Sequence, residues 1–149
     1  MAQVETRARY AQHIILDTRW MDNDAYGHLN NVVYYSLFDT AVNRWLIERD
    51  LLRVADSAAI GLVVETGCRY HAPLTFPDRP TVGMRVAHLG TSSVRYELAV
   101  FRNDDDTASA EGHFVHVYVD RESRRPTPIP PSIRDALGTL RMPVPQPVP

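Results

Sequence analysis

The chain has 149 residues, which suffices for one domain with a single sizeable core, and its net charge of -2 gives no reason to expect a nucleic acid partner. All 16 basic residues are arginine, so Schiff-base chemistry and lysine-dependent phosphate loops are excluded. Cys68 is the single cysteine, which excludes an intrachain disulfide and a multi-cysteine metal site.

The amino terminus, residues 1–10, lacks the long apolar run of a secretory signal. No segment approaches the ~20 consecutive apolar residues that cross a bilayer. We therefore expect a cytoplasmic protein with no membrane partner.

The first half of the chain predicts one strand and one long helix. Residues 10–17 are expected to form the strand, and a turn-rich patch follows over residues 20–30. Asn30 or Asn31 can cap the helix, because an amide oxygen can accept a hydrogen bond from an unpaired backbone N–H. Residues 32–48 contain no proline or glycine and are apolar around most of a helix. Such a helix is expected to be buried.

The second half of the chain alternates apolar and polar residues as strands do. This alternation runs over residues 62–70, 82–86, 94–100 and 108–118, with turns between the segments. Four strands joined by short loops predict an antiparallel meander.

The order of the elements predicts an α+β fold in which about five antiparallel strands wrap around one long helix. We expect a single domain over residues 1–130 and a proline-rich tail over residues 131–149. Within this tail, residues 132–140 are a candidate short helix, and residues 142–149 are expected to be extended or disordered. A five-stranded sheet with one helix leaves edges and faces uncovered, which favours a homodimer or homotetramer.

The densest polar cluster, residues 22–31, comes directly before the long helix. One interpretation is a capped turn, because Asp, Asn and Gly are typical of turns. The other is an active site, because a helix amino terminus offers unpaired N–H groups and a positive dipole end. These groups can hold a carbonyl oxygen as it becomes an oxyanion, beside a carboxylate that acts as nucleophile or general base.

This cluster, written Asp22-x-Asp24-x-x-Gly27-His28-x-Asn30-Asn31 and followed by Tyr34 and Tyr35, resembles the signature of the 4-hydroxybenzoyl-CoA thioesterase-like family. Three later segments also resemble that family, in the same order along the chain. They are Tyr70-His71-Ala72-Pro73 at the exit of a strand, Gly90-Thr91-Ser92-Ser93 at a turn, and Ala110-x-Gly112 in the last long strand.

The resemblance implies a hotdog fold, oligomers with active sites at the subunit interface, and hydrolysis of an acyl-CoA to a carboxylic acid and coenzyme A. Asp24 matches the catalytic aspartate, and Gly27 lets the backbone turn tightly toward the thioester. The backbone N–H of Asn31 matches the group that polarises the thioester carbonyl. His28 either orients Asp24 or the attacking water, or caps the turn.

Two other carboxylates remain alternatives to Asp24. Asp22 is expected to shape the loop together with Asn30, although spacing alone does not separate Asp22 from Asp24. Asp39 lies inside the predicted helix, where other members of the wider hotdog group place the essential carboxylate.

Tyr26 and Tyr34 are candidates for contacts with the acyl group, which the sequence does not identify. The coenzyme end of the substrate is expected to contact Arg69 and Arg95, because arginine forks suit phosphates. Ser92 and Ser93 are candidates at the same end. Neither a metal nor a cofactor is expected, since coenzyme A is part of the substrate. An acyl carrier protein as the thiol carrier and a module that binds acyl thioesters without catalysis remain alternatives.

Overall fold

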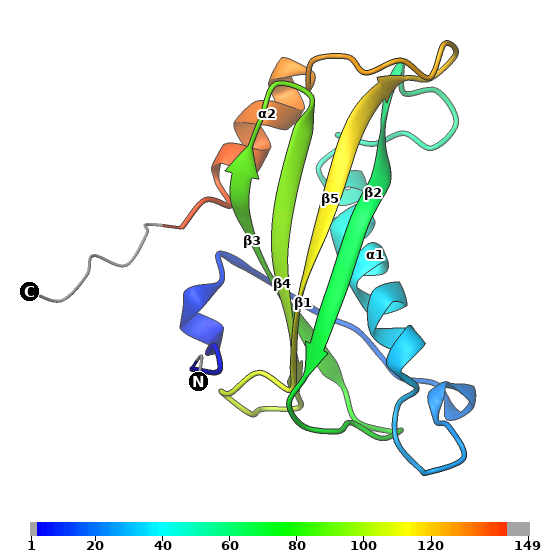
Figure 1. Ribbon diagram of the computed structural model, residues 1–149, viewed down its shortest axis with the longest axis vertical. Helices are drawn as coiled ribbons and strands as arrows, with labels where there is room; N and C mark the ends of the chain where they lie inside the picture. The colour runs from blue at the N-terminus through cyan, green and yellow to red at the C-terminus, as the bar shows by residue number, and fades with distance from the viewer. Residues whose placement is uncertain (1–2, 143–149) are drawn as a thin grey trace, which may run out of the picture.

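The computed structural model describes residues 3–142. Its elements, in chain order, are η1 (Arg7–Arg9), β1 (Gln12–Ile15), η2 (Trp20–Asp22), α1 (Asn31–Glu48), β2 (Ala59–Tyr70), β3 (Pro80–Leu89), β4 (Ser93–Arg102), β5 (Ala110–Asp120) and α2 (Pro131–Gly138). Figure 1 shows α1 lying along one face of the sheet. The expectation for residues 142–149 falls, from residue 143 onward, outside the described residues.

The five strands form one antiparallel sheet in the order β1-β3-β4-β5-β2, so β1 and β2 are its edges. The register places Tyr70, at the end of β2, opposite Ala110, at the start of β5. Ser93, at the start of β4, pairs with Val117 near the end of β5. The end of β2 and the β3–β4 turn therefore lie at opposite ends of the sheet. This arrangement is the hotdog fold, and the predicted fold class is confirmed.

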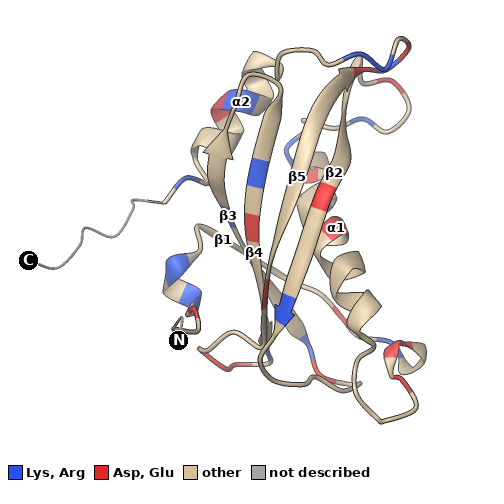
Figure 2. Ribbon diagram, in the orientation of Figure 1, with Lys and Arg blue, Asp and Glu red and all other residues tan. Residues whose placement is uncertain are grey.

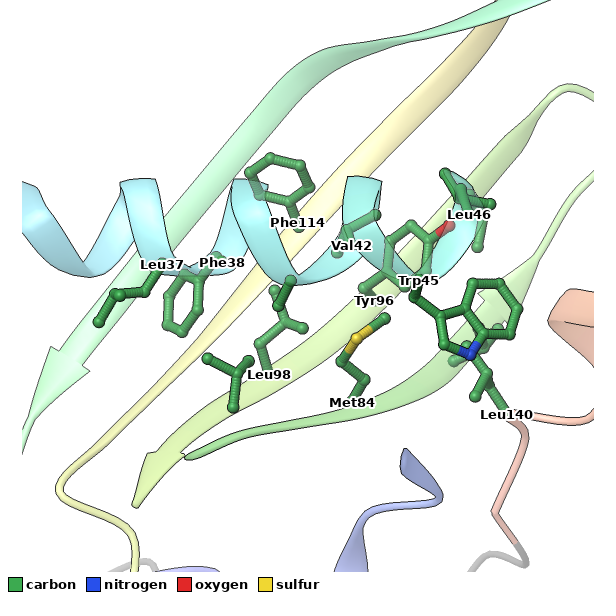
Figure 3. Packing of buried hydrophobic residues seen from close by; sticks show 14 of the residues in the cluster. Leu37, Phe38, Val42, Trp45, Leu46, Met84, Tyr96, Leu98, Phe114 and Leu140 are labelled. Atoms are coloured by element: carbon green, nitrogen blue, oxygen red, sulfur yellow. The ribbon is translucent and has the colours of Figure 1, made fainter. Parts of the chain in front are cut away.

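Helix α1 begins where the sequence predicts, because the side chain of Asn30 accepts a hydrogen bond of 3.1 Å from the backbone N–H of Val32. Its inward face packs on the sheet through Phe38 and Trp45, as Figure 3 shows. Its outward face is exposed and includes Val32 and Ile47, which are 65% and 48% exposed. The expected burial around most of the helix is thus not found in a single chain.

The predicted short helix near the carboxyl terminus is confirmed as α2. Ile133 and Leu137 from this helix, with Leu140 after it, belong to the same buried cluster as α1 and the inner face of the sheet. The backbone N–H of Val86 in β3 also donates to the carbonyl of Leu140 over 2.9 Å. Residues 131–140 therefore pack as part of the domain.

The first strand is shorter than predicted. Strand β1 begins at Gln12, because the backbone N–H of Tyr10 turns back to the carbonyl of Arg7 at 3.1 Å instead of joining the sheet ladder. The Tyr10 ring packs edge-on against Phe101 on the sheet face opposite α1, with ring centroids 5.9 Å apart. Tyr10 is thus a buried residue that lies outside the strand.

Cys68 lies half-buried in β2 and packs against the core. Burial raises the pKa of its thiol to about 11. The thiol is therefore protonated near neutral pH, as expected of a structural cysteine rather than a nucleophile.

Gly112 in β5 gives a test of how tightly α1 packs on the sheet. A Cβ atom there would lie 2.5 Å from the ring of Phe38 and 2.5 Å from the carbonyl oxygen of Gly67, whereas one at Gly138 would meet nothing within 4 Å. We expect Gly112→Ala to lower the free energy of unfolding by about 1–3 kcal/mol through overpacking. Gly138→Ala, at the end of α2, is the matched control and should be neutral or stabilising. Urea denaturation of both variants measures this, and equal stability would contradict the packing described.

Candidate active site

The loop between β1 and α1 is built around Asp22, which is only 4% exposed. One of its carboxylate oxygens accepts the backbone N–H of Arg19 at 2.8 Å, and the other accepts the Arg19 guanidinium at 2.9 and 3.1 Å. Its backbone carbonyl accepts the N–H of Asn30 at 2.9 Å. Asp22 therefore ties the start of the loop to the residue that caps α1, as the sequence interpretation held.

Asp24 organises the tip of the loop and remains accessible. Its Oδ1 accepts the backbone N–H groups of Tyr26 at 2.8 Å and His28 at 3.4 Å, and its own N–H donates to the His28 carbonyl at 2.8 Å. Gly27 turns the chain with a φ of +84°, a conformation that favours glycine. Oδ2 of Asp24 has no hydrogen-bond partner within residues 3–142, so it is available to react.

The start of α1 presents an unpaired donor beside this carboxylate. Because Asn30 caps the N–H of Val32, the N–H of Asn31 is the helix-start donor that has no acceptor in the described part of the chain. It lies at the positive end of the helix dipole. The Asn31 carbonyl accepts the Tyr70 hydroxyl at 2.8 Å, which joins the end of β2 to the helix start.

The segment after β2 closes the other side of the site. The N–H of Leu29 donates to the Leu74 carbonyl at 2.8 Å, and the hydroxyl of Thr75 donates to the Gly27 carbonyl at 2.8 Å. The Tyr34 and Tyr70 rings meet edge to face, with centroids 5.0 Å apart. Burial raises the pKa of both phenols, so each stays neutral near pH 7.

Between these segments lies a cleft of about 340 Å³. Its lining residues are Asp24, His28, Leu29, Asn31, Tyr34, Tyr70, His71, Ala72 and Pro73. One cleft thus holds a carboxylate, an unpaired N–H at a helix start, and apolar and aromatic walls. These are the parts required to attack and polarise a carbonyl group.

Several sequence-predicted site residues meet in this cleft, and others do not. The structure brings together Asp24, His28, Asn31 and Tyr34, with Gly27 in the turn beside them. Tyr26 is 87% exposed at the loop tip and does not line the cleft.

The residues predicted for the coenzyme end lie elsewhere in the single chain. Ser92 and Ser93 occupy the β3–β4 turn at the far end of the sheet. Arg95 is ion-paired with Glu65 at 3.3 Å, and Arg69 pairs in register with Glu111. Figure 2 shows acidic and basic positions along β2 and β4, where these arginines lie.

The sequence assigns no role to His71 or Tyr70, although both line the cleft. It places the segment Tyr70-His71-Ala72-Pro73 only at the exit of a strand. The signal that could have found them is the register of β2, which brings Tyr70 to the start of α1 across 39 residues of sequence.

No helix within residues 3–142 is long and apolar enough to span a membrane. No group of three or more His, Cys, Asp or Glu side chains in that range is arranged to hold a metal ion.

Comparison with known proteins matches residues 18–137 to the family model described as the thioesterase-like superfamily. Among solved structures, the PA5185 protein of Pseudomonas aeruginosa strain PAO1 is 52% identical, with a TM-score of 0.91 over 93% of this chain and 97% of its own. A thioesterase of Thermus thermophilus, solved in complex with coenzyme A and zinc, is 31% identical, with a TM-score of 0.71 over 87% of this chain and 93% of its own. The gentisyl-coenzyme A thioesterase BH1999 is 25% identical, with a TM-score of 0.72 over 83% of this chain and 99% of its own. No curated protein matches the chain.

Substitutions of the two loop carboxylates, Asp22 and Asp24, should change the free energy of unfolding by different amounts. An amide at position 22 would turn an NH₂ group toward the donors of Arg19, so Asp22→Asn is expected to lower the free energy of unfolding by about 1–3 kcal/mol. An amide at position 24 still accepts the turn's two N–H groups, so Asp24→Asn should change it by less than about 0.5 kcal/mol. Chemical denaturation followed by circular dichroism measures both, and the reverse order would exchange the roles of the two residues.

Proposed function

Because the chain belongs to the thioesterase-like superfamily, we propose that it hydrolyses an acyl-coenzyme A thioester to a carboxylic acid and coenzyme A. One relative of known structure is a gentisyl-coenzyme A thioesterase, and another is a thioesterase that binds coenzyme A. The observation that carries the proposal is the cleft in which Oδ2 of Asp24 and the N–H of Asn31 both lack a protein partner within residues 3–142.

The proposed chemistry uses these two groups together. The thioester carbonyl oxygen accepts the N–H of Asn31 at the positive end of α1, which stabilises the negative charge that develops on that oxygen. Asp24 attacks the carbonyl carbon through Oδ2 or takes a proton from the attacking water. The coenzyme leaves as a thiolate, which needs no strong acid. His28 lines the same cleft and is proposed to orient Asp24 or the water.

We further propose that the acyl group lies against Tyr34, and that Tyr26 covers the substrate at the mouth of the cleft. Tyr34 is buried beside Tyr70 and presents an apolar wall. The acyl group must enter between this wall and the segment His71-Ala72-Pro73, which forms the other side of the cleft.

A second copy of the chain would explain the residues that lie far from the cleft. Strand β2 is a sheet edge of 12 residues, and Leu62, Val63 and Val64 on it are 38%, 46% and 60% exposed. An exposed apolar edge of this length favours pairing with another strand. Antiparallel pairing of two β2 strands across a two-fold axis reverses one sheet relative to the other. Ser92 and Ser93 of the second copy then lie at the end of the sheet that holds the cleft.

Thiol release tests the proposed activity. Short, long and aromatic acyl-coenzyme A substrates, together with an acyl carrier protein thioester, are offered to the wild type and to Asp24→Asn. The amide keeps the turn but supplies neither nucleophile nor base, so kcat/KM should fall by about 100-fold or more.

Asp39→Asn is the matched control for this assay, because Asp39 is an exposed carboxylate on α1 that contacts Asn43 and not the cleft. It should retain activity within about twofold. A loss confined to Asp39→Asn would move the chemistry to the helix. Hydrolysis of the carrier protein thioester alone would change the assigned thiol carrier, and no release from any substrate would favour a binding module.

The oligomer is tested at the exposed edge. Val64→Lys puts a charge in the middle of β2, whereas Val54→Lys puts the same charge at a 72% exposed position in the loop before it. We expect Val64→Lys to shift the mass in light scattering toward the monomer and to reduce thioesterase activity, while Val54→Lys retains both. An unchanged mass for Val64→Lys would place the interface elsewhere.

A further inference from the structure

His71 connects the cleft to a carboxylate on the next strand of the sheet. His71 lines the cleft together with Asp24 and His28, and its Nε2 lies 2.5 Å from Oε2 of Glu111 in β5. The Glu111 side chain is only 12% exposed, and that of His71 is 28% exposed. Glu111 also lines a separate hollow of about 400 Å³, formed with residues of β2, β3 and β4. His71 thus lies where the cleft and the hollow meet, in contact with the carboxylate of Glu111.

The backbone holds this pair in place. The N–H groups of His71 and Ala72 both donate to the carbonyl of Ser109, at 2.8 and 3.0 Å, directly before β5 begins. An ionised carboxylate only accepts hydrogen bonds, so the proton of neutral His71 lies on Nε2. The lone pair then lies on Nδ1, the nitrogen that Glu111 does not contact.

The proposed reaction needs such a group. When Oδ2 of Asp24 is the nucleophile, its lone pair goes into a bond to the acyl carbon, and Oδ1 already accepts two backbone N–H groups. The water that later attacks the acyl group must give its proton to another base. Histidine ordinarily titrates near neutral pH, which makes it the side chain best matched to this transfer.

We propose that His71 is the catalytic proton-transfer residue of this site and that Glu111 is its positioning residue, an inference that rests on the proposed thioesterase function. Asp24 Oδ2 bonds to the acyl carbon, the carbon–sulfur bond breaks, and the thiolate leaves. Water then bonds to the acyl carbon and gives one proton to His71 Nδ1, while the bond from that carbon to Asp24 breaks. The acid leaves, and the proton on His71 passes to the thiolate sulfur, so that Asp24 and His71 return to their starting forms.

Titratable groups lie on both sides of His71. Those that line the cleft with it are Asp24 and His28 from the loop, Tyr34 from α1 and Tyr70 from β2. On the other side is Glu111, which contacts Nε2 of His71. The titratable residues that line the hollow with Glu111 are Glu5, Tyr10, Cys68, Arg69, Arg85, Arg95, Glu97 and His113.

A second histidine–glutamate pair supplies a matched control. His113 Nε2 lies 2.9 Å from Oε2 of Glu65, and His113 lines the hollow rather than the cleft. His113→Ala therefore removes an equivalent pair from the same sheet while leaving the cleft intact.

The test compares wild type, His71→Ala, His71→Gln and His113→Ala with an acyl-coenzyme A that the wild type hydrolyses. Rapid mixing should show, for both His71 variants, a burst of about one thiol per active site followed by turnover at least about 100-fold slower than wild type. Intact mass spectrometry should show the acyl group retained on the protein. The Gln side chain can still donate to Glu111, so this variant is informative even where Ala fails to fold. His113→Ala should behave as wild type.

Glu111→Ala and Glu111→Gln add a readout that a structural role would not move. The amide oxygen of Gln can still accept the proton on Nε2 of His71, whereas Ala leaves that proton without its partner. We therefore expect kcat to fall in Glu111→Ala with an unchanged KM, and to recover toward wild type in Glu111→Gln.

Three outcomes would overturn the assignment. They are wild-type turnover in the His71 variants, slow turnover without a burst in those variants, and a kcat in Glu111→Gln no higher than in Glu111→Ala. Each of these, with a wild type whose activity depends on Asp24, refutes the role of His71 alone. A wild type that releases no thiol from any substrate refutes the proposed function and this inference together.

Discussion

The contact between α1 and the sheet at Gly112 determines where the candidate site can form. The Phe38 ring occupies the space that a side chain on Gly112 would fill, so the helix can neither slide along β5 nor lift from it without losing this contact. Interiors packed at this density move between discrete arrangements rather than deforming smoothly. The start of α1 is therefore held at the end of β2, where Tyr70 reaches the Asn31 carbonyl. The unpaired N–H of Asn31 is presented to the cleft as a consequence of core packing.

Asp22 and Asp24 differ in burial and in hydrogen bonding. Their spacing in the sequence does not show this difference. Asp22 is surrounded by the donors of Arg19 and is buried, so every acceptor it has is used to hold the loop. Asp24 is half-buried and uses one oxygen for the turn. The sequence contains the same side chain at both positions, and the difference arises because the short helix η2 turns Asp22 inward. A buried carboxylate that holds the loop and an accessible one with an oxygen that accepts no hydrogen bond within residues 3–142 thus lie two residues apart.

The period of the apolar residues predicted the four later strands and the long helix, because each pattern is local. Burial of α1 on all sides was not found, since apolarity at Val32 and Ile47 indicates that something covers them but not whether it belongs to the same chain. Tyr10 belonged to the core but not to the strand, because local alternation does not show which backbone groups join the ladder.

The sequence could predict only those residues of the candidate site that lie close together in one segment. Asp24, His28 and Asn31 lie within eight residues, and the motif placed them together. His71 and Tyr70 reach the site because of the register between β2 and β5 and because of where α1 packs on the sheet. No local sequence pattern encodes either feature. Alternation also groups Glu111 with His113 on one face of β5 without indicating that this face lies opposite α1.

The arginines of the sheet show how charge pairing narrows the choice of a phosphate ligand. Arg85 is ion-paired with Glu97 and Glu5, and Arg95 with Glu65, so a phosphate at either position would have to displace a carboxylate. Arg69 forms no ion pair with any residue in the range 3–142 and is exposed near the end of β2, where it lines the hollow that Glu111 also lines. A guanidinium without a carboxylate partner can bind a phosphate without first breaking an ion pair, and its planar fork matches phosphate oxygens in pairs. Of the two arginines predicted to contact the coenzyme, Arg69 and Arg95, Arg69 is therefore the one whose guanidinium is not already held by a carboxylate within residues 3–142.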